Sequence, residues 1–118
     1  MEKTSVINAL AALAQENRLG TYRLLVQAGP DGIAAGEIAT ALGLPPNTLS
    51  FHFDRLRQAG LVTVRRDGRS MIYAARYDTM NALIGFLTEK CCGGQPELCG
   101  PADGCAPAAT KPEKEATP

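Results

Sequence analysis

Hydrophobic residues recur every three or four positions through the first half of the chain, which is the period of helices that bury one face. We expect such helices in the segments SVINALAALAQENR, RLGTYRLLVQAG, AAGEIATALGL and LPPNTLSFHFDRLRQAG. Asn17 is the expected cap of the second helix, and Gly43 and Gly60 are expected to end the third and fourth. The residues expected to face inward are Val6, Leu10, Leu13, Leu19, Tyr22, Leu25, Val26, Ile38, Leu42, Leu49, Phe53 and Leu56.

After Gly60 the pattern alternates with a period of two residues, which indicates β-strands. The segment LVTVRRDGRSMIYAA predicts two strands that turn at Asp67-Gly68, a dipeptide typical of tight hairpins. A last helix is expected in YDTMNALIGFLTEKC, and one of its faces would carry Met80, Leu83, Ile84 and Leu87. The expected fold is therefore mainly helical with one β-hairpin, in the order ααααββα.

Composition divides the chain into a folding part and a tail. We expect residues 1–92 to form one domain, because residues 93–118 are rich in Gly and Pro and offer little apolar surface to bury. The domain is small, and Ile7 on the first helix and Phe86 on the last lie beside the main apolar stripes. We therefore expect a homodimer through these two helices, since a partner chain would bury the additional apolar surface.

Charge and hydropathy narrow the class of function. No stretch approaches the ~20 consecutive apolar residues of a membrane span, and the N-terminus lacks a secretory signal, so we expect a cytoplasmic protein with reduced thiols. The net charge is zero, yet residues 45–76 carry six arginines against only Asp54 and Asp67. A basic segment within a neutral chain indicates contact with nucleic acid; the alternative is a solvated charged face.

The third and fourth helices, joined by the turn GLPP, have the spacing of a helix-turn-helix, and the basic hairpin behind them forms a wing. In such a winged helix-turn-helix the fourth helix would lie in the major groove of double-stranded DNA. Its outward face offers Asn47 for an adenine edge, Thr48 and Ser50 for bases or phosphate, Phe51 for a thymine methyl, and Arg55 for phosphate. Alternatively, Phe51 packs under a neighbouring segment.

Two further groups extend the expected DNA contacts. His52, the single histidine of the chain, lies at the flank of this face, where a structural role or a phosphate contact fits better than metal ligation. Arg65, Arg66 and Arg69 surround the tip of the hairpin and are expected to contact the DNA backbone or minor groove. The alternative is that these arginines keep an edge hairpin soluble.

The segment LSFHFDRLRQAGLVTVRRDGRSMIYAA resembles the core of the ArsR/SmtB family of winged-helix metalloregulators. That family has the pattern Ser-x-His-Leu-x-x-Leu-x-x-Ala-Gly-Leu-Val followed by a Gly-Arg hairpin that ends in an aromatic residue, and here Phe53 replaces one leucine. The matching residues are Ser50, His52, Leu56, Ala59, Gly60, Leu61, Val62, Gly68, Arg69 and Tyr73. The resemblance covers residues 5–92. It implies a homodimer built on the first and last helices that binds operator DNA and is released by a metal or metalloid.

The family places its sensor sites at several positions, and two of these are not matched here. Where one type has cysteines on the third helix, this chain has Ala34 and Gly36. Where another type has histidines and carboxylates on the last helix, this chain has Asp78 and Glu89 and no histidine, which disfavours a zinc site of N and O ligands.

All four cysteines, Cys91, Cys92, Cys99 and Cys105, lie at or beyond the expected end of the last helix. Adjacent Cα atoms are ~3.8 Å apart, too close for an unstrained disulfide, and on a helix the first two side chains would diverge by ~100°. Both can turn to one centre where the helix frays, and Gly93-Gly94 supplies that freedom. Three thiolates suit trivalent arsenic, whereas zinc takes a fourth ligand.

Family members that sense arsenite through a C-terminal Cys-Cys pair and a nearby third cysteine look like this chain. The resemblance implies Cys91, Cys92 and Cys99 as ligands of As(III) or Sb(III), with Cys105 as a substitute. We therefore expect an As(III)-responsive transcriptional repressor and not an enzyme. A repressor that senses thiol redox state or another soft metal (Sb, Cd, Pb) is the alternative. A small thiol oxidoreductase fits less well, because a catalytic thiolate needs cationic neighbours and these cysteines have no basic neighbour except Lys90.

Overall fold

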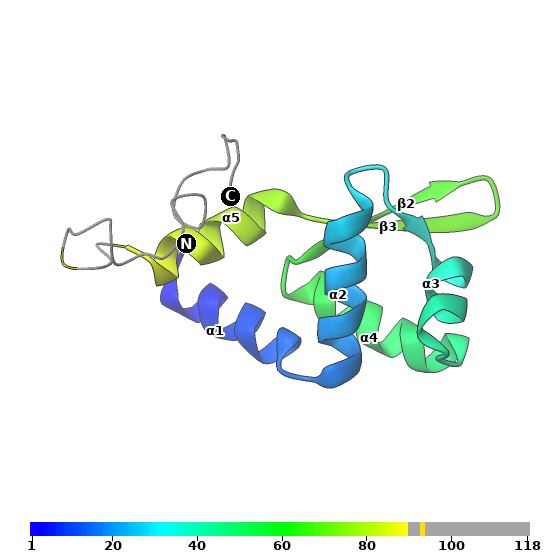
Figure 1. The fold of residues 1–118 in the computed structure, drawn as a ribbon, viewed down its shortest axis with the longest axis horizontal. Helices are drawn as coiled ribbons and strands as arrows, with labels where there is room; N and C mark the ends of the chain where they lie inside the picture. The colour runs from blue at the N-terminus through cyan, green and yellow to red at the C-terminus, as the bar shows by residue number, and fades with distance from the viewer. Residues whose placement is uncertain (90–92, 94–118) are drawn as a thin grey trace, which may run out of the picture. The chain divides into compact units, whose positions relative to one another are not determined.

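The computed structural model describes residues 1–89 and 93, and it has the expected sequence of helices followed by a hairpin and a last helix. Its elements are α1 (Lys3–Leu13), α2 (Glu16–Ala28), β1 (Ile33–Ala34), α3 (Ala35–Leu42), α4 (Pro46–Gln58), β2 (Val62–Asp67), β3 (Ser70–Ala75) and α5 (Tyr77–Leu87) (Figure 1). The predicted fold class is confirmed. The two-residue strand β1 was not predicted, because so short a strand leaves no periodic pattern.

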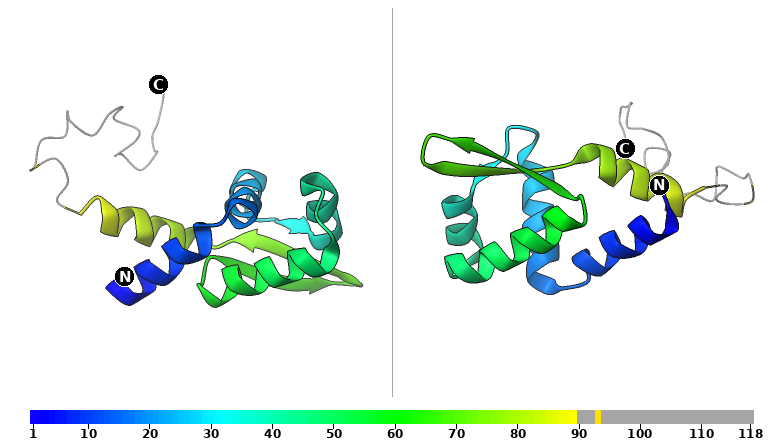
Figure 2. Two further views of the ribbon diagram at one scale, coloured as in Figure 1. Left: turned by 90° about the horizontal axis from the view of Figure 1, so that it is seen from below. Right: turned by 180° about the vertical axis from the view of Figure 1, so that it is seen from behind.

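The wing is the antiparallel hairpin of β2 and β3, paired from Val62 opposite Ala75 to Asp67 opposite Ser70. Its turn is Gly68-Arg69, one residue later than predicted, and Gly68 has the positive φ of 64° that such tight turns require. β1 pairs with the other edge of β3, so the sheet order is β1-β3-β2. The tip of the hairpin extends past α3 and α4 (Figures 1 and 2).

The ends of the helices follow the expected signals except at the start of α2. There the side chain of Gln15 accepts a hydrogen bond of 2.9 Å from the backbone N–H of Arg18, so the prediction of Asn17 as the cap is wrong. Asn17 lies within the helix. Gly43 and Gly60 end α3 and α4 with φ of 66° and 77°, as expected.

The hydrophobic core lies under α4 and the sheet. Of the residues predicted to face inward, the buried ones are Val6, Tyr22, Leu25, Ile38, Leu49, Phe53, Leu56 and Leu83. The prediction is wrong for Leu10 and Leu19, which are 41% and 45% exposed, because Ala9 and Ala12 form the buried face of α1. On α5, Ile84 is 48% and Leu87 58% exposed.

The first residue of α5 is tied to the last turn of α2. The Tyr77 hydroxyl donates a hydrogen bond of 2.9 Å to the backbone carbonyl of Val26. Nearby, burial and the proximity of Tyr77 raise the pKa of Tyr22, so that phenol stays protonated at neutral pH. The start of α5 is therefore fixed to α2.

α5 ends at Leu87, earlier than the predicted end at Cys91. Cys91, Cys92, Cys99 and Cys105, for which thiolate ligation is predicted, lie outside the described residues. Gly93 is described and has a φ of 56°, in the left-handed region that glycine adopts readily.

Residues Met1–Ile84 form one compact unit and Gly85–Pro118 a second. The predicted boundary after residue 92 adjoins residues that the structure does not describe, and it stays a prediction. Within the described residues, none of the helices combines the length and the hydropathy needed to cross a bilayer.

Candidate nucleic-acid interface

α3 and α4 form the helix-turn-helix. After α3 the backbone N–H of Leu44 donates to the carbonyl of Ala39 at 3.1 Å, which closes the helix around left-handed Gly43. α4 then begins at Pro46, because proline suits the first turn of a helix. Its inner face is anchored by Leu49, which is 2% exposed, and by Leu56, which is fully buried.

The outer face of α4 presents the polar residues expected to read DNA. Asn47, Thr48 and Ser50 are exposed in the first half of the helix, the half that enters the major groove in helix-turn-helix proteins. Asp54 and Arg57 form an exposed ion pair of 3.4 Å further along, so part of the negative charge on this face is offset.

Phe51 is 57% exposed beside these polar residues, so the alternative that it packs under another segment is wrong. Its ring meets the His52 ring edge to face, with centroids 5.7 Å apart. The Arg55 guanidinium lies 6.0 Å from the Phe51 centroid. An aromatic edge next to a guanidinium is suited to contact a thymine methyl and the adjacent phosphate together.

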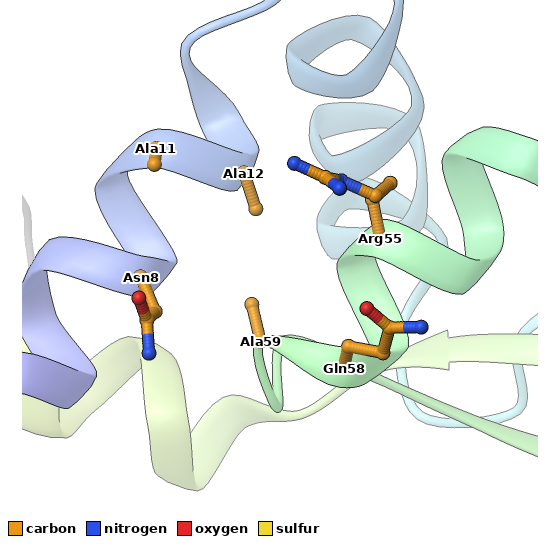
Figure 3. Close-up of a pocket in the computed structure, with 6 residues that line it drawn as sticks. All are labelled: Asn8, Ala11, Ala12, Arg55, Gln58 and Ala59. Carbon is orange, nitrogen blue, oxygen red and sulfur yellow. The ribbon is translucent and has the colours of Figure 1, made fainter.

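The Arg55 side chain borders an open pocket of about 350 Å³ between α1 and the second half of α4. The pocket is lined by Asn8, Ala11, Ala12, Arg55, Gln58 and Ala59, and the Arg55 side chain extends across it toward α1 (Figure 3). The guanidinium is exposed there and remains accessible to a phosphate group.

His52 differs from the other predicted DNA-contacting residues, because its side chain is only 6% exposed. Its Nδ1 lies 3.2 Å from Nη1 of Arg18 on α2, and burial, followed by the charge of Arg18, lowers the pKa of His52. The phosphate contact predicted for this residue does not fit this burial; the structural role does.

The arginines of the wing divide into one that is tethered and two that point to solvent. Nη1 of Arg65 donates a hydrogen bond of 3.0 Å to the backbone carbonyl of Asp31, in the loop before β1, so Arg65 helps to hold the wing. Arg66 and Arg69 are exposed at the tip. The two exposed arginines are in the position expected for contact with the DNA backbone.

An aromatic pair joins the wing to the recognition helix α4. The rings of Phe53 on α4 and Tyr73 on β3 are stacked with centroids 3.7 Å apart and planes 10° apart. The replacement of the family leucine by Phe53 therefore creates an aromatic stack between the two parts that would contact DNA.

The structure also describes the third-helix position at which the resembling family carries cysteines. Ala34 and Gly36 border a shallow pocket of about 580 Å³ whose other lining residues are Glu37, Thr40, Ala41 and Ser70. Across residues 1–89 and 93, no three His, Cys, Asp or Glu side chains come together as a metal site would require. The predicted sulfur ligands lie in the part of the chain beyond this description.

Arg18 is a residue that the sequence analysis missed. It bonds to His52 on α4 and, through Nε, to the carbonyl of Ala12 on α1 at 2.6 Å. No local pattern indicates this role, because an arginine in the first turn of an amphipathic helix is ordinarily a solvated residue.

Known proteins with similar sequences and structures are transcriptional regulators. A family model described as a helix-turn-helix domain matches residues 13–65. YceK of Bacillus subtilis (strain 168), an uncharacterized HTH-type transcriptional regulator, is 36% identical over 77 residues, which are 64% of this chain and 76% of YceK. These similarities are to DNA-binding regulators and not to enzymes, as predicted.

Two solved structures agree with this. An ArsR-like transcriptional regulator from Rhodococcus sp. RHA1 superposes with a TM-score of 0.63 at 26% identity, over 71% of this chain and 76% of that one. The homodimeric winged helix-turn-helix DNA-binding domain of Mb0332 from Mycobacterium bovis, a possible ArsR-family regulator, gives a TM-score of 0.60 at 31% identity, over 74% and 81% of the two chains. The chain thus belongs to the ArsR family of winged helix-turn-helix transcriptional regulators.

Proposed function

We propose that this regulator is an As(III)-responsive repressor, which binds operator DNA as a homodimer and is released when Cys91, Cys92 and Cys99 ligate the metalloid. The observation that carries the inducer is the confinement of all four cysteines to residues 91–105 of a chain whose remainder is a DNA-binding regulator. Cytoplasmic thiols stay reduced, so such a cluster is available as soft ligands.

The DNA-binding part of the proposal is supported by the geometry of α4 and the wing. Asn47, Thr48, Ser50 and Phe51 are exposed on α4, and Arg66 and Arg69 are exposed at the wing tip. In a dimer, two such helices would occupy successive major grooves about 34–36 Å apart. We infer an operator made of two half-sites with that spacing.

The homodimer is supported by apolar side chains that one chain leaves in solvent. Ile7 is 57% and Leu10 41% exposed on α1, and Leu87 is 58% exposed on α5. Single exposed apolar residues are ordinary, but a row on α1 together with one on α5 is what a helical dimer interface would cover. Mb0332 is described as homodimeric, which agrees with this assignment.

The choice of inducer follows from the donor set. Three thiolates neutralise the charge of As(III), whose lone pair fills the fourth direction, and Sb(III) has the same requirement. Typical couplings between ligand sites are about 1–3 kcal/mol, or 5–150-fold in affinity, which suffices to empty an operator.

The test is fluorescence anisotropy with a labelled duplex from the region upstream of the protein's own gene, with and without sodium arsenite. Wild type should bind the duplex and lose at least about fivefold in affinity with arsenite. Cys92→Ser should bind DNA like wild type and no longer respond, whereas Cys105→Ser should respond normally. Affinity unchanged at saturating arsenite would refute the proposal, and release by Cd(II), Pb(II) or an oxidant alone would assign the cysteines to the alternative inducers.

A further inference from the structure

One partly buried arginine, Arg18, connects the N-terminal helix α1, its own helix α2 and the recognition helix α4. Nε of Arg18 donates to the carbonyl of Ala12, in the last turn of α1, at 2.6 Å, and its Nη1 donates to Nδ1 of His52 on α4 at 3.2 Å. The backbone N–H of the same residue bonds to the cap residue Gln15 at 2.9 Å. A single guanidinium therefore spans the distance from α1 to α4.

α1 and α4 are in contact, but side chains do not fill the whole space between them. Where the two helices face each other, the pocket of about 350 Å³ separates them, and three of its lining residues are Ala11, Ala12 and Ala59 (Figure 3). Alanine side chains are too short to interlock across such a gap, whereas large interdigitating side chains fix the spacing of most packed helices. The Arg18 bridge thus adds a constraint that the side chains lining this gap do not supply.

The bridge has a protonation requirement. A guanidinium carries only donors, so Nδ1 of His52 must accept and must be unprotonated. A protonated imidazole has no acceptor to offer, and its positive charge would repel Arg18. The bond therefore exists only with the neutral ring.

The surroundings of His52 favour that neutral ring. Burial and then the charge of Arg18 lower its pKa from the ordinary value of 6.5. Among the described residues, no charged group other than Arg18 contributes to this lowering of the His52 pKa. The other charged residues on α4 and on the elements packed against it are Lys3 on α1, Glu16 and Arg23 on α2, Glu37 on α3, Asp54, Arg55 and Arg57 on α4, and Arg65, Arg66 and Asp67 on β2. Arg18 is thus the electrostatic partner of this histidine.

We propose that Arg18 is a positioning residue for DNA recognition: it holds α4 against α1 in the orientation that reads DNA, and does so only while Nδ1 of His52 carries no proton. This inference rests on the DNA-binding role of the family and not on the identity of the inducer. In this proposal α1, which is also a proposed dimerisation helix, is linked through Arg18 to α4, the helix proposed to contact bases. Loss of the link should therefore weaken DNA binding without removing any group that touches DNA.

The first test is the pH dependence of DNA binding, measured by anisotropy with the same upstream duplex, at constant salt, between pH 8.0 and 5.5. The chain has one histidine, so the part of any pH dependence that disappears in His52→Asn reports on His52. We expect wild type to bind about fivefold or more weakly once the His52 ring is protonated, as followed by the NMR shift of that ring, than at pH 7.5. His52→Asn keeps an acceptor at the place of Nδ1 but cannot gain a proton, so its affinity should be nearly constant with pH.

The sign of the effect separates this role from a phosphate contact. A histidine that touches phosphate gains charge as the pH falls and would bind DNA more tightly, which is the opposite of our expectation. Wild-type binding that stays constant or becomes stronger as the His52 ring gains its proton overturns the proposal. The pKa of His52 is lowered in the folded state, so the stability that its neutral ring contributes is fully present above pH 6.5 and is lost as the pH falls through the lower folded-state pKa. Circular dichroism must therefore show that the protein is folded at each pH.

The second test compares substitutions of Arg18 at pH 7.5. Arg18→Met should weaken DNA binding at least about fivefold, and adding His52→Asn should cost nothing more, since the acceptor that this substitution keeps has already lost its donor. Arg18→Lys keeps the charge but cannot reach both partners, so it should not restore affinity; wild-type binding by Arg18→Lys would refute the bridge. If Arg18→Met does not fold, the pH profiles of wild type and His52→Asn decide the question alone. Arsenite is absent throughout, so failure of the inducer proposal leaves these results unaffected.

Discussion

Arg69 at the tip of the wing offers a quantitative prediction about DNA binding. It is exposed, and it follows Gly68 in the hairpin turn that extends past α3 and α4. If it contacts one phosphate in each protomer, Arg69→Ala removes two phosphate contacts from the dimer. Each contact contributes about 0.9 to the slope of log affinity against log salt concentration, so the slope should become shallower by about 1.8.

The assay is a salt titration of the anisotropy binding curve between 50 and 200 mM KCl. Over this fourfold range, the change in slope amounts to about a tenfold smaller loss of affinity for Arg69→Ala than for wild type. The matched control is Arg23→Ala, which removes the same charge from an exposed position on α2, outside the basic segment. We expect its salt slope to equal that of wild type.

Two results would refute this reasoning. An unchanged slope for Arg69→Ala would mean that the wing tip does not touch phosphate, and the exposed arginine would then serve only solubility. An equal flattening by Arg23→Ala would mean that total charge, and not the position of Arg69, determines the salt dependence.

Two further predictions concern stability, measured as the free energy of unfolding in urea. Leu56 on α4 is fully buried and Leu19 on α2 is 45% exposed, so Leu56→Ala should cost about 2–5 kcal/mol and Leu19→Ala about 1 kcal/mol or less; equal costs would contradict the core described above. Gly32 and Gly29 both have positive φ, of 79° and 94°, but a Cβ at Gly32 would meet the Tyr73 carbonyl oxygen, whereas one at Gly29 meets nothing within 4 Å. Gly29→Ala should therefore cost about 1–3 kcal/mol of backbone strain and Gly32→Ala clearly more, because it adds a steric clash to such strain. The reverse order would show that β1 does not lie against β3.

Most of the fold could be predicted because its elements leave strong local patterns. The prolines before α4, the glycines after α3 and α4, and the alternation around Gly68 each have a local physical cause. Where prediction failed, a tertiary contact or a competing local bond decided. The short strand β1 exists only because Ile33 pairs with Tyr73, and Leu19 is exposed although its spacing suits a buried face.

The exposed residues of the candidate site could be predicted from the sequence, whereas the burial of His52 could not. Asn47, Thr48 and Ser50 followed from the angles of an amphipathic helix once its buried face was known. His52 lies at the edge between the two faces, where a few degrees decide between solvent and core. Its hydrogen-bond partner Arg18 is 34 positions away in the sequence and is brought close by the packing of α2 on α4.

The hydrogen bond between Tyr77 and Val26 has a mechanical consequence for signalling. It fixes the first residue of α5, so under the proposed function a force applied near the far end of this helix would act on a lever attached at Tyr77. A helix of this length measures about 16 Å, and a tilt of about 10° would displace Leu87 by about 3 Å while hardly moving Tyr77. A displacement of that size is enough to disrupt a close-packed contact. Under the proposed function, this attachment would let As(III) ligation in the C-terminal region alter subunit pairing without unfolding the winged domain.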